Sequence, residues 1–139
     1  MREILFRGKR IDNGEFTYGN IMIPRFGGET CIVEQDAPFH SFVYEVAPST
    51  IGQFTGLTDK NGKKIFEGDI GRYKQTDGAK RNGKPIICIG KVVYNAKTAS
   101  FAVESKDETG CKYFDYFPIM DFEVIGNIHD NPELLEVRE

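Results

Sequence analysis

The sequence predicts an all-β protein in which N-terminal β-hairpins precede a small barrel or sandwich and a short C-terminal helical turn. Aromatic residues make up 12% of the 139 residues, including 11 Phe and 6 Tyr, and aromatic rings favour the pleated, half-buried surface of a strand. The 15 Gly and 6 Pro interrupt the chain often, as turns between many short strands require. In the second half, strand-like runs recur about every 8–12 residues, which is typical of small barrels and sandwiches.

Residues 2–23 are expected to form the first hairpin. The run Glu3–Arg7 leads to Asn13-Gly14, and residues 16–23 return before Pro24. Asn-Gly between two strand-like runs is a strong hairpin signal, because both residues tolerate the positive φ of a type I′ turn. Pro24 then ends the return strand, since proline cannot donate to the ladder.

The middle of the chain is expected to hold further short strands and turns. Asn61-Gly62 predicts a second hairpin turn, and Glu67-Gly68-Asp69 predicts a tight corner before another strand. The expected segments before these turns are strands over 30–34 and 42–46, a surface loop over 35–41 between them, and a bent strand over 50–57.

The second half begins with a polar stretch, residues 75–85, that is expected to be a mobile loop. The run 86–94 is apolar on both faces, which predicts a strand that is buried on both sides. In the tail, Asn131 before Pro132 predicts a short terminal helical turn, with an Asn or Asp side chain as its cap. The remaining expected strands span 100–104, 112–117 and 122–128. A change of pattern near Leu57 predicts two regions, 1–57 and 58–139.

Charge and cysteine content indicate an ordinary globular protein. The net charge is −3 and 28% of the residues are charged, a balance that argues against disorder. Cys31, Cys88 and Cys111 are far apart in the sequence, so neither a disulfide framework nor a zinc site is expected. The charged N-terminal stretch argues against a signal peptide, and no apolar run approaches the roughly 18 residues that span a bilayer. We expect a soluble, intracellular protein that does not bind membranes.

Several long stretches of this sequence carry a family pattern. They are Glu3–Arg10, Gly14–Gly19, Tyr44–Val46, Thr50–Leu57, Asp59–Lys63, Ile65–Ile70 and Val124–Pro132. Through these stretches the chain resembles the YopX family of phage and prophage proteins. The resemblance covers essentially the whole chain. The resemblance implies an SH3-like barrel for the C-terminal part and a location in the cytoplasm of a bacterial host cell. It carries over no catalytic residues. Gly71 stands where a β-branched residue is more usual in the family, which we expect to loosen that strand.

Residues that could support catalysis or metal binding are few. His40 and His129 each lack a second ligand at metal-binding spacing, so surface or capping roles are expected. Glu67 and Asp69 flank Gly68 and would point to one side of a strand, where a desolvated pair could act as general acid and base. The alternative is structural: Asp69 accepts backbone N–H bonds at the turn, while Glu67 is solvated or paired with a lysine. The glycines over 52–56 lack the Lys-Ser/Thr of a phosphate-binding loop. No metal or cofactor is therefore expected.

Charge is unevenly distributed along the second half. Residues 72–97 contain seven basic residues against the single acid Asp77. Basic residues with interleaved tyrosines, here Tyr73 and Tyr94, can bind nucleic acid through phosphate contacts and stacking. Against this, the sequence pI is about 5.5, and a solvated loop accounts for the same charges. The candidate nucleic-acid-binding residues are Arg72, Lys74, Lys80, Arg81, Lys84, Lys91 and Lys97.

Three hypotheses about function follow. The leading one is a non-catalytic accessory protein of a phage or prophage that binds an unknown phage or host protein. The second is a nucleic-acid-binding β-barrel that uses the segment Arg72–Lys97. The third is an enzyme with Glu67 and Asp69 as its acid–base pair. Exposed edge strands would also allow homo-oligomers to form.

Overall fold

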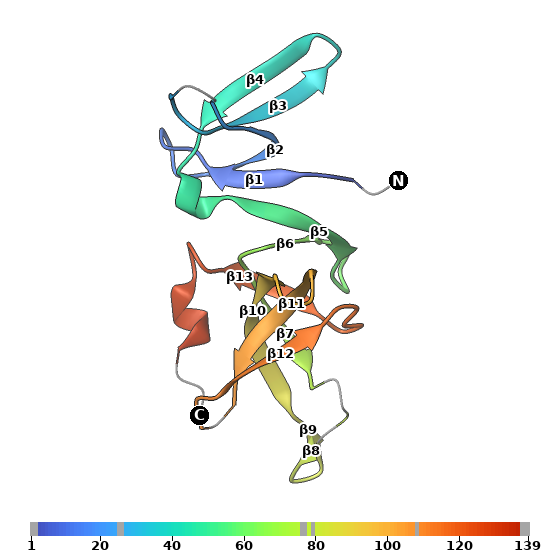
Figure 1. Cartoon of the computed structure of the whole chain (residues 1–139). Helices are drawn as coiled ribbons and strands as arrows, with labels where there is room; N and C mark the ends of the chain where they lie inside the picture. Colours follow the sequence, from blue (N-terminus) through green and yellow to red (C-terminus); the bar gives the residue numbers. More distant parts are fainter. Residues whose placement is uncertain (1–2, 25–26, 76–77, 79, 108, 137–139) are drawn as a thin grey trace. The chain divides into compact units, whose positions relative to one another are not determined.

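The computed structural model describes residues 3–24, 27–75, 78, 80–107 and 109–136, with the side chains of residues 36 and 37 left aside. The described chain is built from short antiparallel strands and two 3₁₀ turns, which confirms the all-β prediction. It divides into two compact units, residues 1–56 and 57–139 (Figure 1). Among the described residues, no helix has the length and apolar character needed to cross a bilayer.

The first unit is an antiparallel sheet with the strand order β4-β3-β2-β1-β5. Its elements are β1 (Phe6–Lys9), β2 (Phe16–Met22), β3 (Cys31–Ala37), β4 (His40–Glu45), the 3₁₀ turn η1 (Pro48–Thr50) and the first part of β5 (Gly52–Thr58). Strand β5 ends in the second unit, where β6 (Lys64–Phe66) is its neighbour in the sheet.

The first hairpin forms where the sequence predicts it. Gly14 has a φ of 72°, and its amide donates to the carbonyl of Arg10 at 2.9 Å. The Arg10 amide donates to the Glu15 carbonyl at the same distance. The chain therefore reverses between β1 and β2 with Gly14 at positive φ. Asn13 does not have a positive φ, so the turn is not of the expected type I′.

The prediction of a surface loop over residues 35–41 is wrong. Strand β3 continues to Ala37, and β4 starts at His40, so only Pro38 and Phe39 connect them. Proline fixes the first turn residue near its required φ, and Phe39 takes the left-handed φ of 64°. Pro38 therefore lies in a two-residue turn between two strands and does not mark a long loop.

The second unit contains an antiparallel five-stranded sheet in the order β12-β11-β10-β7-β13. Its strands are β7 (Asp69–Lys74), β10 (Ile87–Asn95), β11 (Ser100–Lys106), β12 (Lys112–Tyr116) and β13 (Glu123–Asn127). Strands β12 and β13 lie at the two edges of this sheet, and in the residues that the structure describes no sheet closes on itself. The SH3-like barrel implied by the family resemblance is therefore not confirmed.

Two expectations about the second half are corrected. The stretch 75–85 contains a small hairpin, β8 (Lys80–Arg81) and β9 (Lys84–Pro85). A further Asn-Gly pair forms its turn, with φ of 53° at Asn82 and 76° at Gly83. Strand β10 is not buried on both sides, because Cys88 and Val92 are buried whereas Ile87 is 50% exposed.

The core of the second unit lies on one face of this sheet. Its buried members are Ile65, Tyr73, Cys88, Val92, Val103, Ile119 and Phe122. The chain ends in the 3₁₀ turn η2 (Pro132–Leu135), which confirms the predicted helical turn. Its cap is not the expected one: the Asn131 side chain makes no cap bond and instead accepts a hydrogen bond from the amide of Asn127 at 3.2 Å.

Candidate nucleic-acid interface

The face of the five-stranded sheet opposite the core carries most of its charge, and we call it the outer face. Side chains alternate along β7: Gly71 and Tyr73 are buried on the core side, whereas Arg72 and Lys74 are exposed on the outer face. Residues paired across neighbouring strands share a face. The strand registers therefore show which distant residues join Arg72 and Lys74.

Cross-strand pairing gathers five cations on the outer face. Arg72 of β7 is paired with Ile89 of β10. Lys91, two residues after Ile89 on β10, is paired with Glu104 of β11. At the end of β11, Lys106 is paired with Lys112 of β12. We call the resulting set the outer basic face: Arg72, Lys74, Lys91, Lys106 and Lys112.

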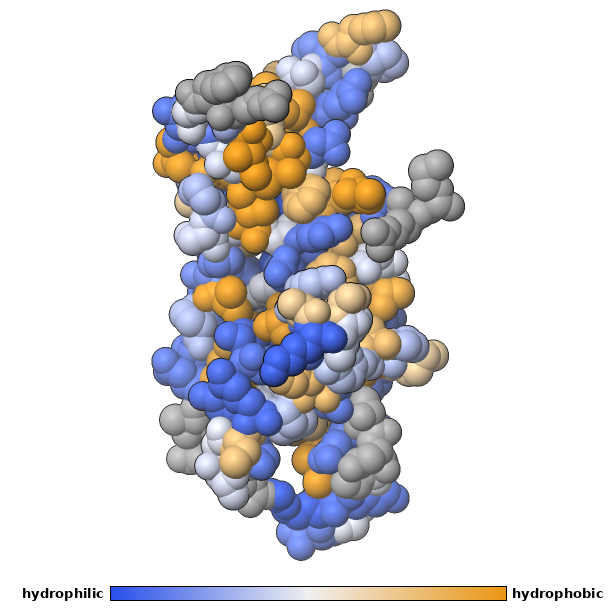
Figure 2. Space-filling model, viewed as in Figure 1, coloured by the Kyte–Doolittle hydropathy of each residue, from blue (hydrophilic) through white to orange (hydrophobic). Residues whose placement is uncertain are grey.

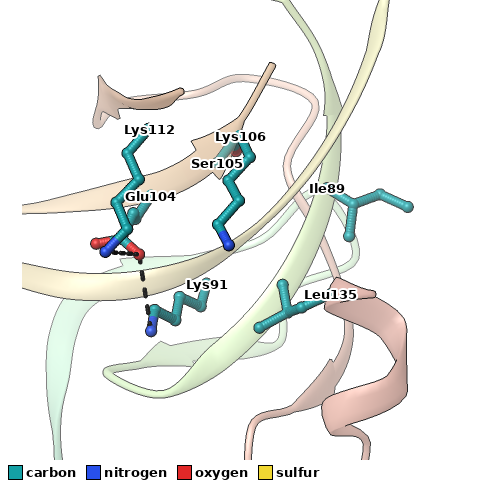
Figure 3. Close-up of a pocket in the computed structure, with 7 residues that line it drawn as sticks. All are labelled: Ile89, Lys91, Glu104, Ser105, Lys106, Lys112 and Leu135. Carbon is teal, nitrogen blue, oxygen red and sulfur yellow. Dashed lines mark ion pairs between the residues drawn. The ribbon is translucent and has the colours of Figure 1, made fainter. Parts of the chain in front are cut away.

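Glu104 lies between two of these cations. Its Oε2 is 3.7 Å from Nζ of Lys91 and 4.0 Å from Nζ of Lys112, and Figure 3 shows it between the two amines. One carboxylate cannot neutralise two ammonium groups. The trio therefore keeps a net positive charge.

Glu123 makes a similar arrangement at the other edge of the sheet. Its Oε1 is 2.9 Å from Nη2 of Arg72 and 3.8 Å from Nζ of Lys60. The hydrogen bond from Arg72, with the charge of Lys60, lowers the pKa of the Glu123 carboxyl. Here too one acid is shared by two cations, so positive charge remains.

A shallow groove of about 170 Å³ lies beside Glu104. Figure 3 shows the lysine side chains on one side of it and the apolar side chains of Ile89 and Leu135 on the other. Leu135 comes from η2. The full lining is Ile89, Lys91, Glu104, Ser105, Lys106, Lys112 and Leu135. Lysines beside apolar side chains suit a ligand that has both anionic and flat apolar parts.

The structure separates the seven predicted basic residues into three groups. Arg72, Lys74 and Lys91 share the outer face. Lys80, Arg81 and Lys84 are exposed on the β8–β9 hairpin, whose surface is hydrophilic in Figure 2. Lys74 is paired with Ile87, the first residue of β10, so the hairpin joins the sheet beside the outer basic face.

Lys97 lies at the opposite end of β10. It is in the turn after Asn95, with its amide donating to Oδ1 of Asn95 at 3.0 Å. Strand β10 has nine residues, so its two ends are about 27 Å apart. The structure does not bring Lys97 together with the other six.

Sequence reasoning missed Lys106 and Lys112. They lie outside the basic segment, in a region where acids predominate, and their position beside Lys91 depends on the pairing of β10, β11 and β12. Alternation was the available signal, because Lys112, Phe114 and Tyr116 are two residues apart and share one side of a strand.

The two tyrosines interleaved with the basic segment are not on the outer face. Tyr73 is in the core, where its hydroxyl donates to Oδ2 of Asp115 and lies 3.4 Å from Oγ of Ser105. Burial, with the hydrogen bond to Asp115, raises the pKa of Tyr73. Tyr94 packs edge-on against Phe101 at 5.3 Å, and its place in the alternation of β10 puts it on the core side.

Asp69 has the structural role described as the alternative to catalysis. It is 2% exposed, and its Oδ2 accepts a hydrogen bond from the amide of Phe66 at 2.8 Å. Gly68 between the two acids has a φ of 93° and donates to the carbonyl of Val92. The corner is thus held by Asp69 itself, while Glu67 is half-buried.

The histidines and cysteines lie apart from one another. His40 packs edge-on against Phe42 at 5.0 Å, and the amide of His129 donates to Oδ1 of Asn127. Within the described part of the chain, no group of three or more His, Cys, Asp or Glu side chains could hold a metal ion. Cys88 is buried and accepts a hydrogen bond from the hydroxyl of Tyr113 at 3.2 Å.

Comparisons with known proteins identify a family and a solved structure of similar fold. A family model described as "YopX protein" matches residues 7–136. The structure titled "Crystal structure of protein EF1440 from Enterococcus faecalis" is similar with a TM-score of 0.51, covering 98% of this chain and 100% of that chain. At 23% sequence identity it shows similarity of fold alone. No match was found among curated proteins.

Proposed function

The chain belongs to the YopX family, and we propose that it is a non-catalytic, phage- or prophage-encoded accessory protein that binds nucleic acid through its second unit. The observation that carries this proposal is the outer basic face, where two glutamates are each shared by two cations. Phosphate backbones bind to surfaces of this kind because cationic side chains release the counterions that surround the nucleic acid.

The β8–β9 hairpin extends the proposed surface. Its three basic side chains are exposed and the hairpin joins the sheet beside Lys74. The proposed surface therefore contains six of the seven basic residues that the sequence predicts. Its other two cations are Lys106 and Lys112 of the outer basic face. The net charge of −3 is not an obstacle, since local clusters of charge attract ligands at distances below the Debye length.

The family assignment supports three further proposals about context. We assign residues 1–57 and 58–139 to two domains, and the second to an SH3-like barrel, on the basis of its five short antiparallel strands. We also propose the cytoplasm of the bacterial host as the location, where phage nucleic acid is accessible.

The test is titration of a fluorescein-labelled DNA oligonucleotide with the intact protein, followed by fluorescence anisotropy. We expect binding at about 50 mM salt that weakens steeply by about 200 mM, because each neutralised phosphate contributes about −0.7 to −0.9 to the logarithmic salt slope. Charge reversal at Lys106→Glu with Lys112→Glu should weaken binding at least tenfold at low salt. Lys9→Glu with Lys64→Glu is the matched control, because it makes the same change in net charge at two lysines outside the five-stranded sheet.

Two results would contradict the proposal. A protein that neither binds the oligonucleotide nor is retained on heparin at low salt does not use this face for polyanions. Equal loss of binding in the two double variants would show a general charge effect without a defined surface.

A second candidate function, binding of a phage or host protein, is favoured by the edge strand β4. His40, Phe42 and Tyr44 form a row of rings on one side of it, with Phe42 stacked on Tyr44 at 6.2 Å, and Val43 on the other side is 54% exposed. Edge strands with exposed apolar side chains pair readily with another chain. If β4 is that surface, Val43→Lys should abolish co-purification of a partner that wild-type protein enriches from phage-infected cells. Light scattering on both forms would identify a second copy as the partner.

A further inference from the structure

Two exposed aromatic rings lie on the outer face beside the groove. Phe114 and Tyr116 are two residues apart on edge strand β12 and are 40% and 43% exposed. Phe114 is paired with Glu104, which lines the groove, and Tyr116 is paired with Ala102. The same alternation places Lys112 on their side of the strand. The rings and the groove lysines therefore form one continuous surface.

Tyr116 is held in place by a hydrogen bond across the sheet. Its hydroxyl accepts from Nδ2 of Asn95 at 2.9 Å, and Asn95 is the last residue of β10. A ring that is fixed at its tip keeps a face toward solvent with little loss of conformational entropy on binding a flat ligand. Tyr113, which packs against the core, lies on the opposite side of β12 from these two rings.

The spacing of the rings fits an unpaired nucleic-acid strand. Residues two apart on a strand are separated by about 6.6 Å. In a duplex, successive bases are about 3.4 Å apart along each strand and their faces are already stacked on one another. A single strand can open this spacing and offer base faces to protein rings, and stacking of this kind tolerates any base.

The cations lie where the backbone of such a strand would run. Lys112 precedes Phe114 on the same side of β12. Lys106 is paired with Lys112, and Lys91 is paired with Glu104, the partner of Phe114. A base on Phe114 thus places its phosphate within reach of lysine side chains about one strand spacing away. The arrangement combines a positive groove with stacking rings, which is how proteins bind single strands without sequence preference.

From these observations we infer that the outer face binds single-stranded nucleic acid in preference to a duplex, with bases stacked on Phe114 and Tyr116. The inference rests on the proposed function and specifies its substrate class. Lysines alone do not distinguish single strands from duplexes or from other polyanions. The two rings supply that discrimination, because they gain contact only with unpaired bases.

The experiment compares three ligands with the intact protein: a labelled oligothymidine, a labelled duplex of equal length, and heparin, which has negative charge but no bases. We expect the single strand to bind more tightly than the duplex. Phe114→Ala and Tyr116→Ala should each weaken single-strand binding about tenfold, while retention on heparin stays unchanged. Phe114→Tyr keeps a ring at the position and should bind like the wild type. Tyr94→Ala removes an exposed ring from the core side and is the matched control, with circular dichroism and thermal unfolding used to verify that each variant is folded.

The possible failures are distinguishable. If single strand and duplex bind equally and the ring variants bind like wild type, this inference is wrong while the proposed function stands. If the single strand is preferred but Phe114→Ala and Tyr116→Ala have no effect, these rings are not the stacking residues and the inference is also wrong. If neither nucleic acid nor heparin binds, the proposed function fails and this inference fails with it.

Discussion

Phe122 occupies the space directly above Gly71 in the core of the second unit. A Cβ added to Gly71 would lie 1.9 Å from Cζ of Phe122, and 2.3 and 2.5 Å from Cε1 and Cε2 of that ring. Both residues are buried, and Phe122 also packs against Tyr73 and Phe117. The glycine therefore makes room for the ring that fills the core. That it also loosens β7 stays a prediction.

Gly71→Ala should destabilise the protein by about 1–3 kcal/mol, because the added methyl group must displace the Phe122 ring. A leucine at position 122 would lack Cζ, Cε1 and Cε2, the three ring atoms that the added methyl group meets. Gly71→Ala should therefore cost much less stability in a Phe122→Leu background. Chemical unfolding of the four forms gives the coupling energy between the two positions. Additive effects would show that the collision is relieved elsewhere.

Asp59 links the Asn61-Gly62 turn to β13. Its Oδ1 accepts from the amides of Asn61 and Lys63, and its Oδ2 accepts from the amide of Val124, 65 residues along the chain, at 3.0 Å. In Asp59→Asn an amide NH₂ would face one of these donors. We expect a loss of about 1–3 kcal/mol in the free energy of unfolding.

Asp107→Asn is the matched control for Asp59→Asn. Oδ1 of Asp107 accepts from the amides of Thr109 and Cys111, with the same sequence spacing, in an exposed turn. The asparagine oxygen can still accept these two bonds, so we expect a smaller loss. Equal losses in the two variants would contradict the importance of the bond to Val124.

The Asp59 interaction should also depend on pH. Burial opposes the charged form of Asp59, but the amides of Val124, Lys63 and Asn61 outweigh it and lower its pKa below 3.8. A lowered pKa in the folded state means that the unfolded chain binds more protons, so this stabilisation is present above about pH 4 and is lost as the pH falls through the folded value. The stability difference between wild type and Asp59→Asn should therefore shrink in acid. A difference that stays constant down to pH 2 would contradict this assignment.

Tyr113 should make the protein sensitive to alkali. Burial, with the hydrogen bond to Cys88, raises the pKa of Tyr113 from 10.0 to about 12. Between these values the folded state keeps a proton that the unfolded chain releases, so stability falls as the pH rises from 10 toward 12. Unfolding monitored across this range should show a weaker pH dependence in Tyr113→Phe. An unchanged dependence would show that other groups cause it.

Glu104→Gln should strengthen nucleic-acid binding. The substitution removes the carboxylate shared by Lys91 and Lys112 and leaves their charges unopposed. Exposed ion pairs contribute about 0.2–1 kcal/mol, so we expect an increase in affinity of about two- to fivefold at low salt and a steeper salt dependence. Glu133→Gln changes an acid on η2 that does not line the groove and controls for the change in net charge. Equal gains in the two variants would contradict a local role for Glu104.

Local features of the fold followed from short stretches of sequence. Asn13-Gly14 formed a hairpin turn, and Asn61-Gly62 formed another, in which the Gly62 amide donates to the Asp59 carbonyl. The C-terminal turn began at Pro132. Each depends on the φ preferences of two or three neighbouring residues, which no distant contact needs to supply. The third Asn-Gly pair, Asn82-Gly83, carries the same signal within a charged stretch for which the polar composition predicts a loop.

Only the tertiary structure decided which side chains lie together. Lys106 and Lys112 join Lys91 and Arg72 because the registers of four neighbouring strands place them on one face, and a one-residue slip would turn each set to the other side. Gly71 acquires its role only once Phe122 lies above it. The sequence by itself determined the turns and the class of fold, since these are set by local backbone preference. The binding face depended on packing between segments far apart in the chain.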